Sequence, residues 1–252
     1  MSEKKQNSNK KKKSRLTLNL RIVLFLGVFV IAAMLLIHHK KSETAAQHPV
    51  VQDEPVQIQQ SEKIGVKLGN GLEILDVGGY TGAYVEDGTD EIVSGILMLK
   101  VINNGTSTVE YASITMEVNG KTAEFAVSTL KPGATVVLLE KNRMVYDKNA
   151  NYLDGELACE NLSVFREPLN LYEDKIAVQV LDGAINVTNI SQEDIPGRIS
   201  IYYKNAAAGV YYGGITYRVT LENGLKAGEI RQMTAKHFSD TGSEIMFLTI
   251  AE

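Results

Sequence analysis

The sequence predicts an all-β protein that follows a single membrane-spanning helix. Three observations support this prediction: one uninterrupted apolar stretch near the N-terminus, many short runs rich in β-branched residues after it, and no long helical period among those runs. Gly, Asn and Asp separate the runs, which is typical of strands joined by tight turns.

The apolar stretch, residues 22–37, contains no charged side chain. As a helix it would cover about 24 Å, slightly less than the ~30 Å hydrocarbon core of a bilayer. Arg21 before it and the basic residues 38–41 after it can reach the interface and cover the difference. A cleaved secretory signal is the alternative, but its apolar core is usually about 7–15 residues long, so an uncleaved anchor is favoured.

Charge is distributed unevenly along the chain. Residues 1–41 contain ten Lys and Arg and a single acid, whereas the remainder contains 16 Lys and Arg and 29 Asp and Glu. Basic flanks stay on the cytoplasmic side, so we expect a cell-membrane protein with a cytoplasmic N-terminus and an extracytoplasmic C-terminal part. The basic tail should meet anionic membrane lipids rather than nucleic acid, and the acidic remainder lacks the basic patches that nucleic acid requires.

The chain divides into five predicted segments. One of them, residues 42–62, carries two prolines, several glutamines and no sustained pattern, which indicates a flexible spacer. The segments are a basic cytoplasmic tail (1–21), a transmembrane anchor with its flank (22–41), the spacer (42–62), a first β-sandwich (63–168) and a second β-sandwich (169–252).

Strand patterns begin after the spacer. Asn119-Gly120 lies between two of the runs and predicts a two-residue hairpin, since both residue types tolerate the positive φ of a type I′ turn. The single cysteine, Cys159, excludes an intramolecular disulfide, so a hydrophobic core must stabilise the fold. The predicted strands cover residues 72–77, 93–102, 111–118, 122–127 and 135–140.

The sequence then repeats itself. A run that ends in Asn103 is matched by one that ends in Asn189, and Leu-Lys-Pro-Gly at 130–133 is matched by Leu-Lys-Ala-Gly at 225–228. Two copies of about 85–105 residues agree with the ~100 residues of an immunoglobulin-like β-sandwich. We therefore predict two tandem immunoglobulin-like β-sandwiches after the membrane helix.

The first copy also resembles a known type of module. Residues 101–106 (Val-Ile-Asn-Asn-Gly-Thr) and 130–133 are similar to the CARDB and FxLYD β-sandwiches of bacterial extracytoplasmic proteins. In those modules a strand ends in Asn, and a Leu-x-Pro-Gly turn leads into a late strand. The second copy departs from this pattern, because Ile190-Ser191 follows Asn189. The resemblance implies an adhesion or interaction module and brings no catalytic residues.

The sequence gives little support to an enzyme. Three of the four histidines, at 38, 39 and 48, flank the span or lie in the spacer, which leaves His237 alone for a His-based metal or catalytic site. Cys159 lies near two leucines and is expected to pack in the core, as free cysteines usually do. We predict a non-catalytic protein with no cofactor.

An acidic cluster is the first candidate site. Clustered oxygens are the ligands that Ca²⁺ prefers, but the cluster lacks the spacing of an EF-hand loop, and a specific site needs six to eight converging oxygens. A solvated acidic loop is therefore the favoured interpretation. The candidate metal ligands, around Gly88, are Glu86, Asp87, Asp90 and Glu91.

Two pairs of adjacent tyrosines form the second candidate site, on a hairpin with its tip at residues 205–209. Alternation along a strand should expose one tyrosine of each pair, and Tyr202 and Tyr211 are the predicted binding residues because Tyr favours interfaces. Tyr203 is expected on the core side, and Gly213-Gly214 is expected to kink its strand. The alternative is ordinary cross-strand pairing of the rings.

These features together predict a single-pass, membrane-anchored protein that presents two β-sandwich modules outside the membrane for binding or assembly. Its expected partners are membrane lipid, through the span and the basic tail, and a protein or cell-wall component outside. The alternative is an accessory or regulatory subunit of an envelope enzyme or transporter complex.

Overall fold

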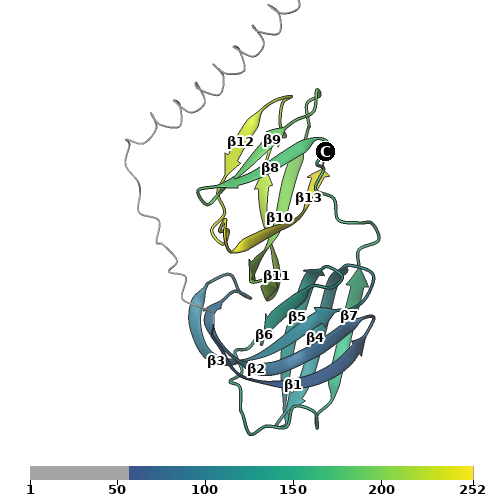
Figure 1. Ribbon diagram of the computed structural model, residues 1–252, viewed down its shortest axis with the longest axis vertical. Helices are drawn as coiled ribbons and strands as arrows, with labels where there is room; N and C mark the ends of the chain where they lie inside the picture. The colour runs from purple at the N-terminus through teal and green to yellow at the C-terminus, as the bar shows by residue number, and fades with distance from the viewer. Residues whose placement is uncertain (1–56, 252) are drawn as a thin grey trace, which may run out of the picture. The chain divides into compact units, whose positions relative to one another are not determined.

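The computed structural model describes residues 57–251, which form an all-β structure of several sheets (Figure 1). The predicted all-β fold class is confirmed for this part of the chain. The predicted cytoplasmic tail, membrane anchor and most of the spacer lie outside the described residues. Within residues 57–251, no helix has the length and apolar character needed to cross a membrane.

Thirteen strands follow one another in the described residues, and they include the five predicted from the sequence. Most of these five strands are longer than predicted, because the backbone pairing continues beyond the strongest hydrophobic pattern. The strands are β1 (Gln57–Gly69), β2 (Leu72–Tyr84), β3 (Glu91–Asn103), β4 (Val109–Val118), β5 (Lys121–Leu130), β6 (Thr135–Leu139), β7 (Leu157–Val164), β8 (Ile176–Leu181), β9 (Ala184–Asn189), β10 (Arg198–Ala207), β11 (Val210–Leu221), β12 (Ile230–Met233) and β13 (Ser243–Ala251).

The pairing pattern of the first strands is found again in the later strands of the chain. One sheet has the order β1-β2-β3-β6-β11-β10-β13, and two have three strands, β5-β4-β7 and β12-β9-β8. The groups β2-β3-β6 and β5-β4-β7 recur six strands later as β8-β9-β12 and β11-β10-β13. We call β2–β7 the first repeat and β8–β13 the second repeat. The two repeats share the seven-stranded sheet because β6 pairs in parallel with β11.

Strand β1 changes one predicted boundary. It pairs antiparallel with β2, from Gln57 opposite Thr81 to Gly69 opposite Leu72. The predicted spacer is therefore wrong over residues 57–62. The Gln-rich segment carries little strand signal of its own, but the open side of β2 supplies backbone hydrogen-bond partners for it.

A buried asparagine closes the end of β3. Asn103 is fully buried, and its Nδ2 donates to the carbonyl oxygens of Ser107 and Leu130, each at 2.9 Å. Its Oδ1 accepts from the backbone N–H of Gly105 at 2.9 Å. Its backbone oxygen accepts from the N–H of Gly133, in the Leu-Lys-Pro-Gly turn. One side chain thus joins the strand end, the turn that follows it and the turn before β6.

The second repeat makes the same set of bonds at the end of β9. Asn189 is also fully buried, and its Nδ2 donates to the carbonyl oxygens of Glu193 and Leu225 at 2.8 and 3.2 Å. Its Oδ1 accepts from the N–H of Ser191, and its backbone oxygen accepts from the N–H of Gly228. The matching Asn positions in the sequence therefore make matching hydrogen bonds in the structure.

Apolar clusters fill the space between the sheets of each repeat. Leu99 of β3 and Phe125 of β5 belong to the cluster of the first repeat, and Ile185 of β9 and Ile201 of β10 to that of the second. A further cluster, which includes Met98, lies on the other face of the first repeat's larger sheet, since successive residues of a strand point to opposite faces.

We expect Asn103→Ala to lower the free energy of unfolding by about 1–3 kcal/mol, because the buried carbonyl group of Leu130 and the carbonyl group of Ser107 lose their donor. Asn104→Ala is the matched control. The Asn104 side chain is exposed and donates to Glu73, so its loss should cost less than about 0.5 kcal/mol. Denaturant unfolding of the purified protein measures both values, and equal losses would contradict the structural role given to Asn103.

Candidate functional site

The contact between the two repeats brings together the acidic cluster and the tyrosine hairpin, which the sequence suggested as separate sites. Residues 210–212 of β11 pair in parallel with residues 135–137 of β6. The loop after β2, residues 85–90, bonds to β11 and to the segment after β12. We call this region the junction.

Glu86 joins its loop to two strands at the junction. Its Oε1 accepts from the backbone N–H of Gly214 in β11 at 2.8 Å and from that of Leu139 in β6 at 3.2 Å. Burial raises the pKa of the Glu86 carboxyl, while these two hydrogen bonds and the charge of Lys204 oppose the increase. The carboxylate therefore fixes the loop of the first repeat to the bend in β11.

Lys204 of β10 is fully buried next to the same part of β11. Its ammonium group donates to the carbonyl oxygens of Ser128 and Gly214, each at 3.0 Å, and to that of Ile215 at 2.8 Å. Ser128 belongs to β5 in the first repeat, so the lysine bonds to both repeats. Burial lowers the pKa of Lys204 to about 7, and the Glu86 carboxylate opposes the decrease.

Two glycines allow β11 to approach the first repeat closely. A Cβ atom on Gly214 would overlap the carbonyl oxygen of Ala126 in β5, and one on Gly213 would overlap the side chain of Val85. Gly213 also has a φ of +80°, which side chains rarely adopt. The predicted kink at these glycines is confirmed, because the β10–β11 register shifts where β11 passes through them.

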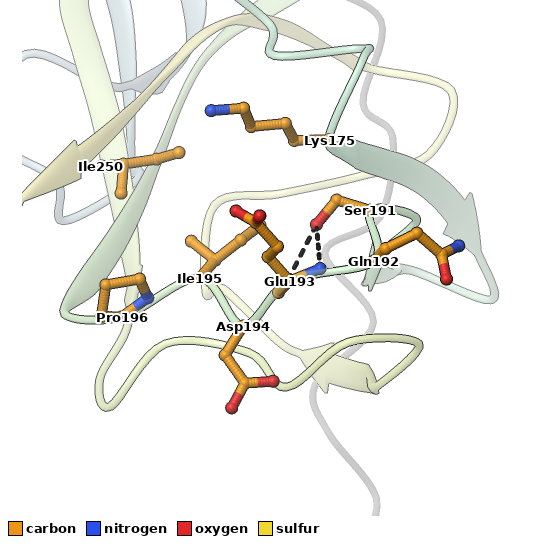
Figure 2. Close-up of a pocket in the computed structure, with 8 residues that line it drawn as sticks. All are labelled: Lys175, Ser191, Gln192, Glu193, Asp194, Ile195, Pro196 and Ile250. Carbon is orange, nitrogen blue, oxygen red and sulfur yellow. Dashed lines mark hydrogen bonds between the residues drawn. The ribbon is translucent and has the colours of Figure 1, made fainter.

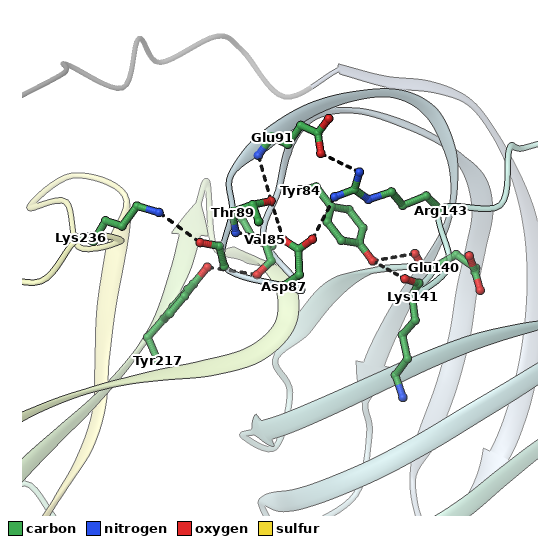
Figure 3. Close-up of polar contacts among 11 residues, drawn as sticks. Tyr84, Val85, Asp87, Thr89, Glu91, Glu140, Lys141, Arg143, Tyr217 and Lys236 are labelled. Atoms are coloured by element: carbon green, nitrogen blue, oxygen red, sulfur yellow. Dashed lines mark hydrogen bonds and ion pairs between the residues drawn. The ribbon is translucent and has the colours of Figure 1, made fainter.

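A second set of contacts joins the loop to the second repeat (Figure 3). The Tyr217 hydroxyl donates to the carbonyl oxygen of Val85 at 3.3 Å, and Lys236 Nζ donates to that of Gly88 at 3.2 Å. His237 stacks on Tyr217, with ring centroids 4.8 Å apart, and its Nδ1 lies 2.7 Å from Asp90 Oδ2. The loop therefore bonds to Tyr217, Lys236 and His237 of the second repeat as well as to Gly214.

Arg143 holds the same loop from within the first repeat (Figure 3). Its guanidinium donates to Asp87 Oδ2 at 2.9 Å and to Glu91 Oε2 at 2.7 Å, and it lies over the Tyr84 ring. The Tyr84 hydroxyl donates to the carbonyl oxygen of Lys141 at 2.8 Å. Hydrogen bonds from Thr89 lower the pKa of Asp87, and Arg143 adds to this effect.

The four candidate calcium ligands thus point to different partners: Glu86 to backbone amides, Asp90 to His237, and Asp87 and Glu91 to Arg143. Among residues 57–251, no three His, Cys, Asp or Glu side chains are grouped to hold a metal ion. A calcium site at this loop stays a prediction. The junction role of Glu86 and Asp90 could not be foreseen from the sequence, because their partners lie more than 120 residues away.

The two candidate binding tyrosines have different surroundings. Tyr211 is only 6% exposed, so its expected exposure is wrong. The reason is that β11 continues onto β6, which packs the Tyr211 ring into the first repeat's core. Tyr202 is partly exposed and stacks on Phe247, with ring centroids 4.2 Å apart. Tyr203 is 2% exposed, and its predicted core position is confirmed.

An open hollow of about 490 Å³ lies in the second repeat, away from these residues (Figure 2). The Ser191 hydroxyl at its wall lies 2.7 Å from Asn189 Oδ1 and 2.9 Å from the carbonyl oxygen of Glu193, and its one proton is donated to either acceptor, so it stabilises its own turn. The hollow contains none of the predicted site residues. Its lining is Lys175, Ser191, Gln192, Glu193, Asp194, Ile195, Pro196 and Ile250.

The close approach at Gly214 makes a specific prediction. Gly214→Ala should lower the free energy of unfolding by more than about 3 kcal/mol, because the methyl group meets backbone that cannot move aside. Gly209→Ala, at the tip of the same hairpin, is the control. It has a φ of +78° but no atom within 4 Å of its Cβ position, so it should cost about 1 kcal/mol. Unfolding curves that give similar losses would contradict this account.

The burial of Lys204 predicts that stability depends on pH. Its folded pKa of about 7 lies below the ordinary 10.5, so between these values the unfolded chain holds a proton that the folded chain has released. The free energy of unfolding should therefore rise from about pH 7 to about pH 10. Denaturant unfolding in one-unit pH steps measures the rise.

Lys204→Met is the control, because it has no amine to titrate and should lose this rise. The comparison ends near pH 10, since burial raises the pKa of Tyr84 and Tyr203 to about 12 and deprotonation then lowers stability. The same pH slope in both proteins would show that Lys204 is not the group responsible.

The chain was also compared with known proteins. No protein-family model, no curated protein and no solved structure matches it. The resemblance to CARDB and FxLYD modules therefore rests on the turn residues around Asn103 and Gly133, and it stays a prediction.

Proposed function

We propose that this protein is a single-pass membrane protein that presents two immunoglobulin-like β-sandwiches outside the membrane as one rigid, non-catalytic unit for binding or assembly. The observation that carries the proposal is the junction. Two modules on a flexible linker would move independently, whereas here the linked repeats share a sheet and bury charged groups between them.

The rigidity follows from bonds that belong to neither repeat alone. Movement of one repeat against the other would break the β6–β11 pairing, the bond from Lys204 to the Ser128 carbonyl oxygen and the bond from the Gly214 N–H to Glu86. Each hydrogen bond to a charged group contributes about 1.5–3 kcal/mol, so the repeats should move as one body. A rigid arm of this kind suits a protein that holds a binding surface at a fixed distance.

The immunoglobulin-like assignment is supported by the repeated strand order. Each repeat places three strands opposite three, and the core lies between the two layers. The length of each repeat and the antiparallel pairing within it are those of small β-sandwiches. The resemblance to CARDB and FxLYD modules, which serve adhesion and interaction, points in the same direction.

An aromatic surface on the second repeat is the part best suited to recognition. Tyr202 stacks on Phe247, and Phe165 packs edge-on against Phe247 at 5.5 Å between centroids. Arg218, which is exposed, lies opposite Tyr202 in the register of β10 and β11. Partly exposed Tyr beside Arg is a common composition for the energetic centre of an interface.

The alternative function is an accessory or regulatory subunit of an envelope enzyme or transporter. The same rigid arm would serve to position such a partner. Purification of the full-length protein from gently solubilised membranes separates the two: a partner enzyme or transporter at fixed stoichiometry favours the alternative. Loss of that partner in Tyr202→Ala, but not in Asn104→Ala, would locate the contact on the aromatic surface.

Topology is the first property to test. Protease added outside intact protoplasts should degrade the C-terminal part beyond about residue 42 and leave a tag at the N-terminus protected, because the basic flank stays in the cytoplasm. Immunoblots against tags at both termini give the readout, with permeabilised cells as the control. A C-terminal tag that survives in intact protoplasts would contradict the proposal.

A further inference from the structure

Strand β8 is an edge strand without the usual protection against pairing. The edge strands of the described sheets are β1, β13, β5, β7, β12 and β8. The first five each carry Lys, Arg or Glu. The sequence of β8, Ile-Ala-Val-Gln-Val-Leu, has no charge and no Pro, and its pairing with β9 has no register shift. Natural edges normally use such features to prevent contact with another strand.

The open side of β8 offers backbone groups at Val178 and Val180. The Ile190 N–H donates to the Lys175 carbonyl oxygen at 2.9 Å, so these two residues form a hydrogen-bonded pair. Counting from this pair shows which residues of β8 direct their backbone groups toward β9. Because hydrogen-bonded and non-bonded residues alternate in antiparallel pairing, the N–H and C=O groups of Val178 and Val180 point away from β9.

The corresponding edge in the first repeat is covered. Strand β2 occupies the place of β8 in the repeated order, and β1 pairs with its outer side. The described chain supplies no such strand for β8. Apolar side chains are exposed there as well, since Val180 is 37% and Leu181 58% accessible to solvent.

We propose that β8 pairs antiparallel with β8 of a second copy of this chain. The two three-stranded sheets β12-β9-β8 would then become one sheet of six strands. A two-fold axis at Gln179 places Val178 opposite Val180 of the second copy, so both pairs exchange backbone hydrogen bonds.

Charge identifies a second copy as the occupant. Three of the described strands carry no charge, β6, β8 and β9, and only β8 among them has an open side. A neutral strand meets no like charge when it pairs with itself. The chain also joins its own repeats by edge pairing, at β6 and β11. The inference goes beyond the proposed function and does not depend on membrane anchoring.

Disulfide cross-linking of the full-length protein in its membranes tests the pairing. Gln179→Cys is exposed, and the axis would place it opposite itself at a Cα separation of about 4.5 Å, within disulfide range. Gln232→Cys is the matched control, because Gln232 is exposed on β12 in the same row across the sheet. Both variants also carry Cys159→Ala. We expect at least about tenfold more linked dimer from Gln179→Cys, since only this pair meets the disulfide distance limits.

Charge exchange gives an independent readout. Gln179→Lys or Gln179→Glu alone should reduce dimer about two- to fivefold, because like charges directly opposite each other destabilise a strand pair. Differently tagged Lys and Glu variants, expressed together, should associate again and co-purify. Gln232→Lys should leave the dimer unchanged.

Two results would overturn the proposal. They are equal linking of Gln179→Cys and Gln232→Cys, and linking of Gln179→Cys to a different protein. The unfolding midpoint of each variant should match that of its Gln-containing parent, which confirms that the exposed substitutions leave the fold intact. Dimer formation in protein whose protease topology contradicts the anchor would still support the β8 pairing.

Discussion

The Lys204 ammonium group connects the two repeats where their backbones come closest. Three carbonyl oxygens from β5 and β11 surround it, and no solvent reaches it. Removing a charge from water is costly, so this arrangement is stable only while all three acceptors and the nearby Glu86 carboxylate stay in place. The bend at Gly213-Gly214 brings them together, and the shared sheet follows from that bend. The relative placement of the repeats therefore depends on one lysine and two glycines.

Much of the fold could be predicted because its signals are local. Asn119-Gly120 forms the expected hairpin turn, with φ values of 51° and 74°, since the two residue types favour that backbone conformation wherever they occur. Asn103 and Asn189 could also be matched in the sequence, because each bonds to the turn that immediately follows it. Strand β1 was not foreseen, since its partner lies on β2 and its own residues have little strand preference.

The junction could not be predicted, because its partners are distant in the sequence. Strand alternation alone placed Tyr211 outside, but the ring packs against the first repeat, which alternation within one hairpin does not describe. Glu86 and Asp90 looked like solvated acids, since neither the amide of Gly214 nor the ring of His237 is near them in sequence. The acidic cluster and the tyrosine hairpin could each be recognised in the sequence. That they lie side by side follows only from the pairing of β6 with β11.

The parallel pairing of β6 with β11 also sets an order of events during synthesis. Strand β6 emerges roughly 70 residues before β11, an interval of about 4–15 s at ordinary rates of translation. During that interval one side of a neutral strand, Thr-Val-Val-Leu-Leu, has no neighbour, although the rest of the first repeat can already fold. An unpaired apolar edge is the feature most prone to join the wrong strand. The nascent chain is thus most vulnerable to misassembly while the ribosome is still translating the second repeat, before the finished protein's stability has any bearing.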